Sequence, residues 1–168
     1  YPTNADEQCP GQYVTRHVVL GGDFRTDIAL FSLKLDAIFR LKPALSETQT
    51  AMRTICEALS AAACQLLQIE AGEILAEFRP ALNAGGADGL RVEVFLYDTL
   101  AGGAGFSPQM VPRAQELFGR ALALLENCPG QCHTACYRCL RTFRNKLDHG
   151  LIDRFVGAQL LRHVLHDV

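Results

Sequence analysis

Four cysteines lie close together near the end of the chain, and their residue type and spacing are typical of a metal site. They follow the pattern C-x3-C-x3-C-x2-C within the twelve residues CPGQCHTACYRC. Thiolate is a soft ligand that selects zinc, and four thiolates can close a tetrahedral site with no open coordination position. The sequence therefore predicts one zinc ion, bound by Cys128, Cys132, Cys136 and Cys139.

Two other interpretations of the cysteines stay open at this point. Paired disulfides are the main alternative, because four cysteines can also cross-link in pairs. A redox-active CxxC pair is less favoured, since it gives the other two cysteines no role. His133 lies inside the loop and could replace one cysteine as ligand. With four thiols available, we interpret His133 as a solvated loop residue.

A glycine-rich stretch, AGGAG, follows a predicted strand and precedes a predicted helix, with glycines at Gly102, Gly103 and Gly105. Backbone amides in such a loop can hold a phosphate, for example one of DNA. The stretch lacks GxGxxG spacing and the sequence contains no GK[ST], which excludes a nucleotide P-loop. The competing interpretation is a tight turn whose glycines adopt positive φ.

Carboxylates offer a weaker candidate site. Asp98 ends the strand before the glycines and could join Asp27 or Glu93 around a magnesium ion, as in metal-dependent nucleases. No companion lysine has nuclease-like spacing, so an aspartate that caps the turn is the favoured interpretation. A Ser-His-Asp set is not visible either. We expect this chain by itself to hydrolyse neither ATP nor DNA.

Basic residues gather directly after the cysteines, between Tyr137 and Arg154, and Phe143 is interleaved with them. Such a surface can neutralise phosphates and stack on bases, so it predicts a contact with single-stranded DNA. The alternative is a solvated surface, or arginines that bridge to carboxylates of a partner domain. We expect Asn145 and His149 to fix this loop onto the domain. The basic residues are Arg138, Arg141, Arg144, Lys146 and Arg154.

Composition bounds the class of protein. A chain of 168 residues that is 49% hydrophobic can bury a core as a single domain. No apolar run is long enough to span a bilayer, and no secretory signal is recognised. The net charge of −2 gives no overall attraction to nucleic acid or membrane, so any such affinity must be local. Cys9, Cys56 and Cys64 are scattered, which suits buried thiols in a reducing cytoplasm.

Hydrophobic periodicity predicts the elements that position these residues. The predicted strands are 13–20, 27–35, 73–79 and 90–96, and the predicted helices are 48–67, 108–126 and 151–166. We expect the first two strands to pair as a hairpin or as sheet neighbours, and the last two to be antiparallel neighbours. The order predicts an α+β domain, a largely antiparallel sheet packed with amphipathic helices, with a four-cysteine zinc knuckle between the last two helices. We expect residues 1–12 to form a loose N-terminal segment and residues 13–168 to form a single domain. Because the chain starts without methionine in a turn-rich segment, we expect it to be part of a longer protein.

Three stretches together resemble a known family. They are RTDIALFSL, LYDTLAGGAGF, and the cysteine motif with its continuation CLRTFRNKLDHGLIDR. In content and order they are similar to the MrfA-type zinc-binding domain. This is the C-terminal domain of MrfA-like (Hrq-type) superfamily 2 DNA-repair helicases, and it also occurs in phage-defence proteins of the DISARM kind. The resemblance runs from about Arg25 to the end and implies that the four cysteines are the zinc site. Ala135 differs from the glycine that the family often has before its third cysteine, but a small residue still fits.

This resemblance implies a function beside a helicase. Our first hypothesis is an accessory zinc-binding domain of an ATP-dependent DNA helicase in DNA repair or phage defence. Its partners would be upstream motor domains or a helicase subunit, together with single-stranded DNA. The second hypothesis, of another class, is a stand-alone protein-interaction module of a defence complex. The third is a metal-dependent nuclease that uses Asp98.

Overall fold

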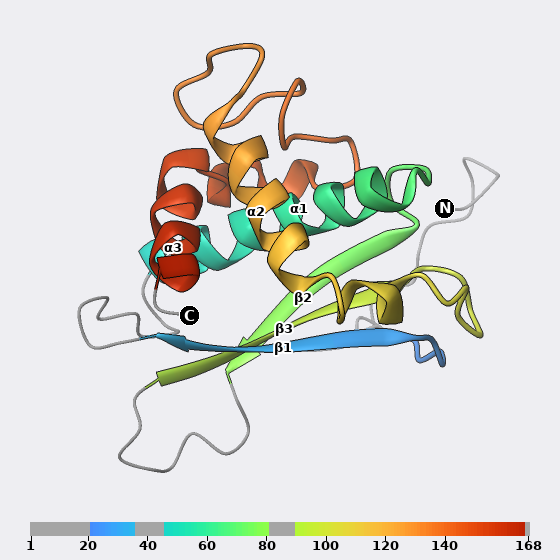
Figure 1. The fold of residues 1–168 in the computed structure, drawn as a ribbon. Coiled ribbons are helices and arrows are strands. Elements are labelled where there is room, and N and C mark those ends of the chain that lie inside the picture. Colours follow the sequence, from blue (N-terminus) through green and yellow to red (C-terminus); the bar gives the residue numbers. More distant parts are fainter. Residues whose placement is uncertain (1–20, 36–45, 81–89, 167–168) are drawn as a thin grey trace, which may run out of the picture.

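The structure is a computed structural model that describes residues 21–35, 46–80 and 90–166. Three helices pack over one face of a three-stranded antiparallel sheet (Figure 1). The loop that carries the four cysteines, drawn in orange, projects from the helix layer on the side away from the sheet. The prediction of an α+β domain with a cysteine cluster between the last two helices is confirmed. The predicted strand 13–20 lies outside the described residues.

The sheet has the order β1-β3-β2, so the strand that comes last in the sequence lies in the centre. The strands are β1 (Ile28–Leu35), β2 (Ile74–Pro80) and β3 (Leu90–Asp98). Both pairings are antiparallel, which confirms the expected pairing of the last two strands. In β3, Val92, Val94 and Leu96 alternate with half-buried residues and are buried against the helices, as period-two side-chain geometry requires.

The helices are α1 (Ser46–Leu67), α2 (Ala114–Glu126) and α3 (Arg154–His166). The apolar stripe of α1 forms the centre of the core, where Ile55 and Leu59 are fully buried. Cys56 and Cys64 are buried in the same core as free thiols, so their predicted packing role is confirmed. Burial raises the pKa of Cys56, which keeps this thiol protonated at neutral pH. Among the described residues, no helix is long and apolar enough to cross a membrane.

Two helices begin later than the periodicity predicted. Residues Ser107–Met110 form a short 3-10 helix, and α2 starts only at Ala114. Pro112 explains the difference, because a proline inside a helix lacks the N–H donor and clashes with the preceding turn. The last helix begins at Arg154, after Asp153, whose carboxylate accepts the backbone N–H of Phe155 at 2.9 Å. This carboxylate caps the helix and thereby fixes its first turn.

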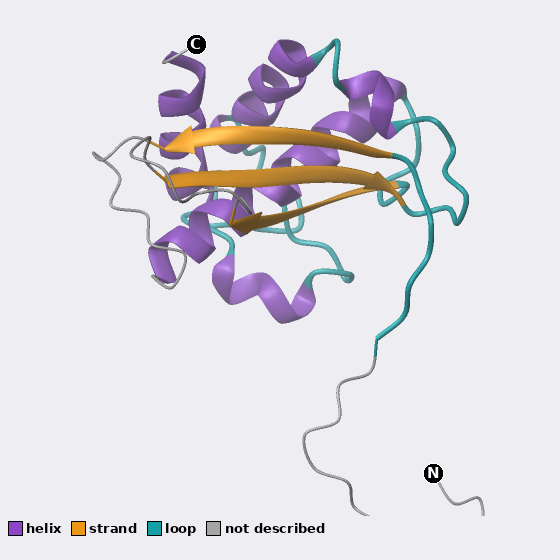
Figure 2. Cartoon of the chain, turned by 90° about the horizontal axis from the view of Figure 1, so that it is seen from below, coloured by secondary structure: helices purple, strands orange, loops and turns teal. Residues whose placement is uncertain are grey.

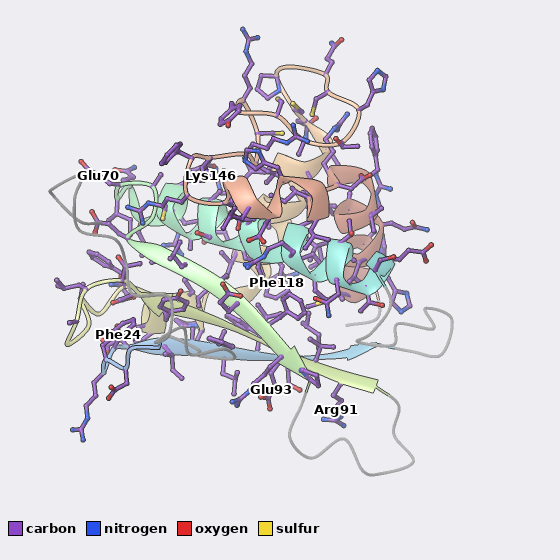
Figure 3. All side chains as sticks on the ribbon, turned by 180° about the vertical axis from the view of Figure 1, so that it is seen from behind. Phe24, Glu70, Arg91, Glu93, Phe118 and Lys146 are labelled. Atoms are coloured by element: carbon purple, nitrogen blue, oxygen red, sulfur yellow. The ribbon has the colours of Figure 1, made fainter. Side chains whose placement is uncertain are left out.

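The outer face of the sheet is not covered by the three helices (Figure 2). At one end of it, Ile28 and Leu30 are 54% and 47% exposed. The ring of Tyr97 lies 6.4 Å from that of Phe24 and 6.2 Å from that of Phe95. The other end is charged. Figure 3 shows Arg91 and Glu93 pointing away from the helices, whereas Phe118 lies between the helices and the sheet.

Candidate metal centre and the surface around it

The chain between α2 and α3 has no α-helix or strand and must be held by other means. After Glu126 it passes through the four cysteines, then through a 3-10 helix over Lys146–Leu151, and joins α3 at Arg154. Successive cysteines are separated by three, three and two residues, and the path of the chain brings all four together. Cys128 is buried and the other three are half-buried.

The four sulfur atoms form a compact cluster in which all lie within 4.8 Å of one another. Cys128 Sγ is 3.5 Å from Cys132 Sγ and 3.6 Å from Cys136 Sγ. Cys139 Sγ is 3.7 Å from Cys132 Sγ and 3.8 Å from Cys136 Sγ. All four are free thiols, so this arrangement differs from the disulfide alternative.

The spacing of these sulfurs fits zinc. A tetrahedron with four zinc–sulfur bonds of about 2.3 Å has edges of about 3.8 Å. The sulfur–sulfur distances of 3.5–3.8 Å are close to this edge length. Among the described residues, the four cysteines are also the only group of three or more potential metal ligands close enough to share an ion. The donor set is all thiol, which favours zinc over magnesium or calcium.

The electrostatics of the cluster also favour a cation. Hydrogen bonds from the backbone amides of Cys132 and Gly130 lower the pKa of Cys128 to about 6. Burial, with the neighbouring thiols, raises the pKa of Cys132 to about 12, and burial raises the pKa of Cys139 as well. One thiolate therefore opposes the ionisation of its neighbours. A divalent cation relieves this repulsion, because it stabilises all four thiolates together.

Small residues allow the loop to close around the sulfurs. A Cβ at Gly130 would lie only 3.2 Å from Cys136 Sγ, so a larger residue would press on this sulfur. Ala135 is only 5% exposed and leaves no room for a bulky side chain. His133 is exposed and is not part of the cluster, which confirms its interpretation as a solvated loop residue.

Arg154 joins the cysteine loop to the helices and is the residue whose role the sequence did not reveal. Its Nε donates to the carbonyl of Cys132 at 2.9 Å, and its Nη1 donates to the carbonyls of Leu125 at 2.9 Å and Glu126 at 3.2 Å. A positive charge at these last carbonyls of α2 also complements the helix dipole. Arg154 is only 9% exposed. The expectation that it belongs to an exposed basic surface was therefore wrong.

A second anchor holds the loop after the cysteines. The Asn145 side chain is buried and donates to Glu57 Oε2 of α1 at 2.8 Å and to the Leu140 carbonyl at 2.9 Å. His149 Nε2 lies 3.0 Å from Asn145 Oδ1. These contacts confirm the prediction that both residues fix the loop to the domain. Asp148 adds an ion pair with Arg53 of α1 at 3.0 Å, so its charge is directed inward.

Comparison with known proteins identifies the kind of domain to which this site belongs. The chain matches the family described as MrfA Zn-binding domain over residues 55–140, which is more than half of its length and includes all four cysteines. The chain belongs to the MrfA Zn-binding domain family. The family and the four-sulfur cluster together confirm zinc as the predicted cofactor.

Two relatives of this MrfA Zn-binding domain are much longer proteins. It is 35% identical over 171 residues to the Druantia protein DruE of Escherichia coli (strain UMEA 4076-1), a match that covers 94% of this chain and 9% of DruE. It is also similar to the crystal structure of DUF1998 helicase MrfA bound to DNA, at 22% identity and a TM-score of 0.46, over 70% of this chain and 14% of that one. The chain thus spans a small part of either relative.

The basic residues of the MrfA Zn-binding domain differ in how free their charges are. Arg138 is exposed, and so is Lys146, whose Nζ lies 4.6 Å from the centroid of the Phe143 ring. Arg144 is exposed but its Nη1 donates to the Gly72 carbonyl at 3.3 Å. Arg141 is half-buried, with Nη2 3.5 Å from the His149 carbonyl. Arg138, Arg144 and Lys146 therefore present most of the charge to solvent.

The carboxylate of Asp98 is used within the turn that follows β3. It accepts the backbone N–H groups of Ala104 at 2.8 Å, Phe106 at 3.0 Å and Ser107 at 2.8 Å, and also the Ser107 hydroxyl. Burial raises the pKa of Asp98, but the Ser107 hydroxyl and the three N–H groups outweigh it and leave this pKa lowered. Asp98 is fully buried, so its interpretation as a turn-capping residue is confirmed and the geometry gives no support to a nuclease site.

The three glycines form a tight turn around the domain's own carboxylates. Their φ angles are +93° at Gly102, +81° at Gly103 and +73° at Gly105, which confirms the tight-turn interpretation. Gly105 donates its N–H to Asp27 Oδ2 at 2.9 Å, and the amides of the other two donate to backbone carbonyls at 2.8 and 3.0 Å. A Cβ at Gly103 would collide with the Asp27 carboxylate. The expected phosphate contact of these glycines does not agree with this geometry, because their amides already donate to acceptors of the chain.

Proposed function

We propose that this chain is an accessory zinc-binding domain of an ATP-dependent DNA helicase, or of a related phage-defence protein, and that it contacts single-stranded DNA. The family and the 35% identity to a defence protein support the helicase or defence context. We infer that residues 13–168 act as one domain. Six free thiols among the described residues are consistent with a reducing, cytoplasmic location.

The sulfur cluster is the observation that carries this proposal. We infer that Cys128, Cys132, Cys136 and Cys139 are the ligands of one zinc ion. When bound, zinc closes the loop between α2 and α3 and leaves no position for a substrate, so its role is structural. The residues around the cluster support that role, since Arg154 and Asn145 hold the same loop by hydrogen bonds, beside the few apolar side chains that the loop adds to the core.

The charge of the loop between α2 and α3, residues 127–153, supports a contact with DNA; we call this segment the zinc loop. Arg138, Arg144 and Lys146 present positive charge on a chain whose net charge is −2. Attraction to DNA must then come from this local surface and must weaken as salt rises. If three cations each meet a phosphate of a single strand, the log–log slope of affinity against salt is about −2, at about −0.7 per contact.

The test combines zinc content with binding of a fluorescent single strand at several salt concentrations. The domain purified without added metal should carry about one zinc per chain. The double variant Arg138→Glu with Lys146→Glu reverses two of the charges. It should lose most of its binding to the single strand and keep its zinc content unchanged. Arg120→Glu on α2 is the control for charge reversal outside the zinc loop, and each single variant, Arg138→Glu or Lys146→Glu, is compared with it because each makes the same change of charge. If the double variant binds the single strand as tightly as the parent domain does, the proposed DNA contact is wrong.

One observation favours the second function, a protein-interaction module. The outer face of the sheet is apolar at one end, where Phe24, Ile28 and Leu30 are about half exposed. A folded domain usually keeps such contiguous apolar patches small unless a partner covers them. Ile28→Glu with Leu30→Glu should then abolish association with the motor polypeptide in a pull-down while zinc and DNA binding persist. Unchanged association would remove the support for this function.

A further inference from the structure

The most exposed large apolar side chains of the described residues lie in one segment, which runs from the last two cysteines of the zinc site into the 3-10 helix after it. Tyr137 is 70% exposed, Phe143 77% and Leu147 89%. Elsewhere in the described part of the chain, exposed large apolar side chains range from 39% to 60%. Aromatic rings held in water are energetically unfavourable, and their concentration in one segment indicates a binding surface.

The turn that carries Phe143 is fixed in place. The N–H of Thr142 donates to Asn145 Oδ1 at 2.8 Å, and the N–H of Asn145 donates to Thr142 Oγ1 at 3.3 Å. The Asn145 amide group is tied in turn to Glu57 of α1. Phe143 lies between these two residues, so its ring is presented by a turn that is bound at both ends. A side chain presented in this way loses little conformational entropy when it binds a partner.

One cation lies over the ring, and a second follows the ring in the sequence. Lys146 Nζ lies 4.6 Å from the Phe143 centroid, and Arg144 is the next residue in the chain, with its guanidinium against Gly72. Figure 3 places Lys146 on the helix side of the molecule, away from Arg91 and Glu93 on the outer face of the sheet. An apolar protein partner would have to bury the ammonium group next to the ring, which is costly. A nucleotide matches both features, since its base can stack on the ring and its phosphate can pair with the cation.

We propose that Phe143 stacks on an unpaired base of single-stranded DNA and that Lys146 and Arg144 contact the adjoining phosphates. This inference rests on the DNA contact proposed above and adds base stacking to it. Single strands are favoured over duplex, because the faces of paired bases are already covered by their neighbours. Tyr137 offers a second exposed ring in the same segment. It packs edge-on against His149 at 5.5 Å between ring centroids, and His149 is bound to the turn through Asn145.

The experiment compares a 15-residue oligo(dT) with an abasic strand of the same length and charge, by fluorescence anisotropy at low salt. The parent domain should bind oligo(dT) more tightly than the abasic strand. Phe143→Ala should weaken oligo(dT) binding about 5- to 150-fold, the range for loss of one stacked base, and leave the abasic strand and the salt slope unchanged. Phe143→Trp should retain binding, because it keeps an aromatic face.

Two control variants make the readout specific. Phe24→Ala removes a ring that is 53% exposed next to Tyr97 of the sheet, and it should not change either affinity. Lys146→Gln should weaken both strands alike and make the salt slope shallower by about 0.7. Zinc content is measured for every variant, so that loss of binding through unfolding is recognised.

The outcomes separate this inference from the proposed function. If the parent binds both strands equally and Phe143→Ala changes neither, base stacking is wrong while the phosphate contact stands. If the parent binds neither strand, the DNA contact itself is wrong and stacking with it. Binding to a duplex of the same length as tight as to oligo(dT) would also overturn the inference, since a duplex offers no free base face.

Discussion

The helix–sheet body and the zinc loop are two regions of one small domain that are held by different forces. In the body, Ile55, Leu59 and Leu96 are fully buried in a continuous apolar core. Between α2 and α3, residues 127–153 form no α-helix or strand. The buried residues of that stretch are Cys128, Ala135, Leu140, Asn145 and Ile152. The loop adds only Ala135, Leu140 and Ile152 to the core, and the rest of its order depends on the sulfur cluster and a few buried hydrogen bonds.

This difference shows how a small domain can display aromatic and basic side chains. Among the described residues outside the loop, the most exposed phenylalanine and tyrosine rings are those of Phe24 and Phe155, at 53% and 55%, whereas a loop closed by a metal can direct its rings further outward. Phe143 and Lys146 lie in the second kind of region. The comparison predicts that the two regions respond differently to substitution, to metal removal and to acid.

Loss of a ligand should give the largest effect. Cys139→Ser should abolish stoichiometric zinc binding and the order of residues 127–153, since structural zinc sites contribute about 10–16 kcal/mol of apparent binding free energy. Hydrogen exchange should show fast exchange in this loop, while α1 and β3 stay protected. Cys64→Ser, at a thiol buried in the core, should keep its zinc. Full zinc content in Cys139→Ser would show that the cluster is not the metal site.

A cavity in the body should give the next largest effect. Leu96 is fully buried in the central strand, so Leu96→Ala should lower the free energy of unfolding by about 2–5 kcal/mol. Urea denaturation measures this change, and zinc should remain bound in the native protein. Leu100→Ala, at a residue that is 60% exposed, should change stability by less than about 0.5 kcal/mol. If the folded Leu96→Ala variant loses its zinc, the stability of the zinc loop depends on the core of the helix–sheet body, contrary to this comparison.

Arg154 connects the two regions, and its removal should affect both. Arg154→Gln leaves the carbonyls of Cys132 and Leu125 without their donor, which should cost about 2–3 kcal/mol and weaken zinc retention against a chelator. Arg162→Gln is the matched control on the same helix. Its ion pair with Glu126 at 2.7 Å is exposed, and such pairs contribute less than about 1 kcal/mol. Equal effects of the two variants would contradict a special role for Arg154.

Acid should disrupt the two regions at different pH values, which is the smallest of these expected effects. Protons compete with zinc for thiolates, so the loop should release zinc first as pH falls. The lowered pKa of Asp98 means that its carboxylate stabilises the fold above its ordinary pKa of about 3.9, and that this stability is lost only as pH falls through the lower, folded value. A zinc-sensitive dye and circular dichroism, followed together against pH, should show two steps. Simultaneous loss of both signals would argue against separate regions.

Local features of the sequence predicted the cysteine cluster well. The cysteines are so close in sequence that a short loop brings them together, and the sulfur cluster depends on little else. The antiparallel pairing of β2 and β3 also followed from two alternating segments with a turn between them. In both cases the interacting residues are near one another along the chain, which is the range that spacing rules describe.

Contacts between distant residues could not be predicted in this way. Nothing local distinguishes Arg154 from the other arginines near the cysteines, and its partner Leu125 belongs to a different helix. The glycine loop has the composition of an anion-binding loop, and its amides do bind carboxylates. One of these belongs to Asp27, which directly precedes β1 and is far away in sequence. The sequence thus indicated that these amides bind an anionic group, but not that this group is a carboxylate of the same chain.

The position of β3 has a consequence for how the protein is made. Ile28 of β1 pairs with Tyr97 of β3, and α1 and β2 lie between them in the chain. A nascent polypeptide therefore emerges with β1 and β2 before their shared neighbour exists. The sheet can form only after Asp98 has left the ribosome, when a long loop must close between β1 and β3. Until then the apolar strand IALFSLKL is open to other chains, and this interval of synthesis is when the protein is most exposed to aggregation.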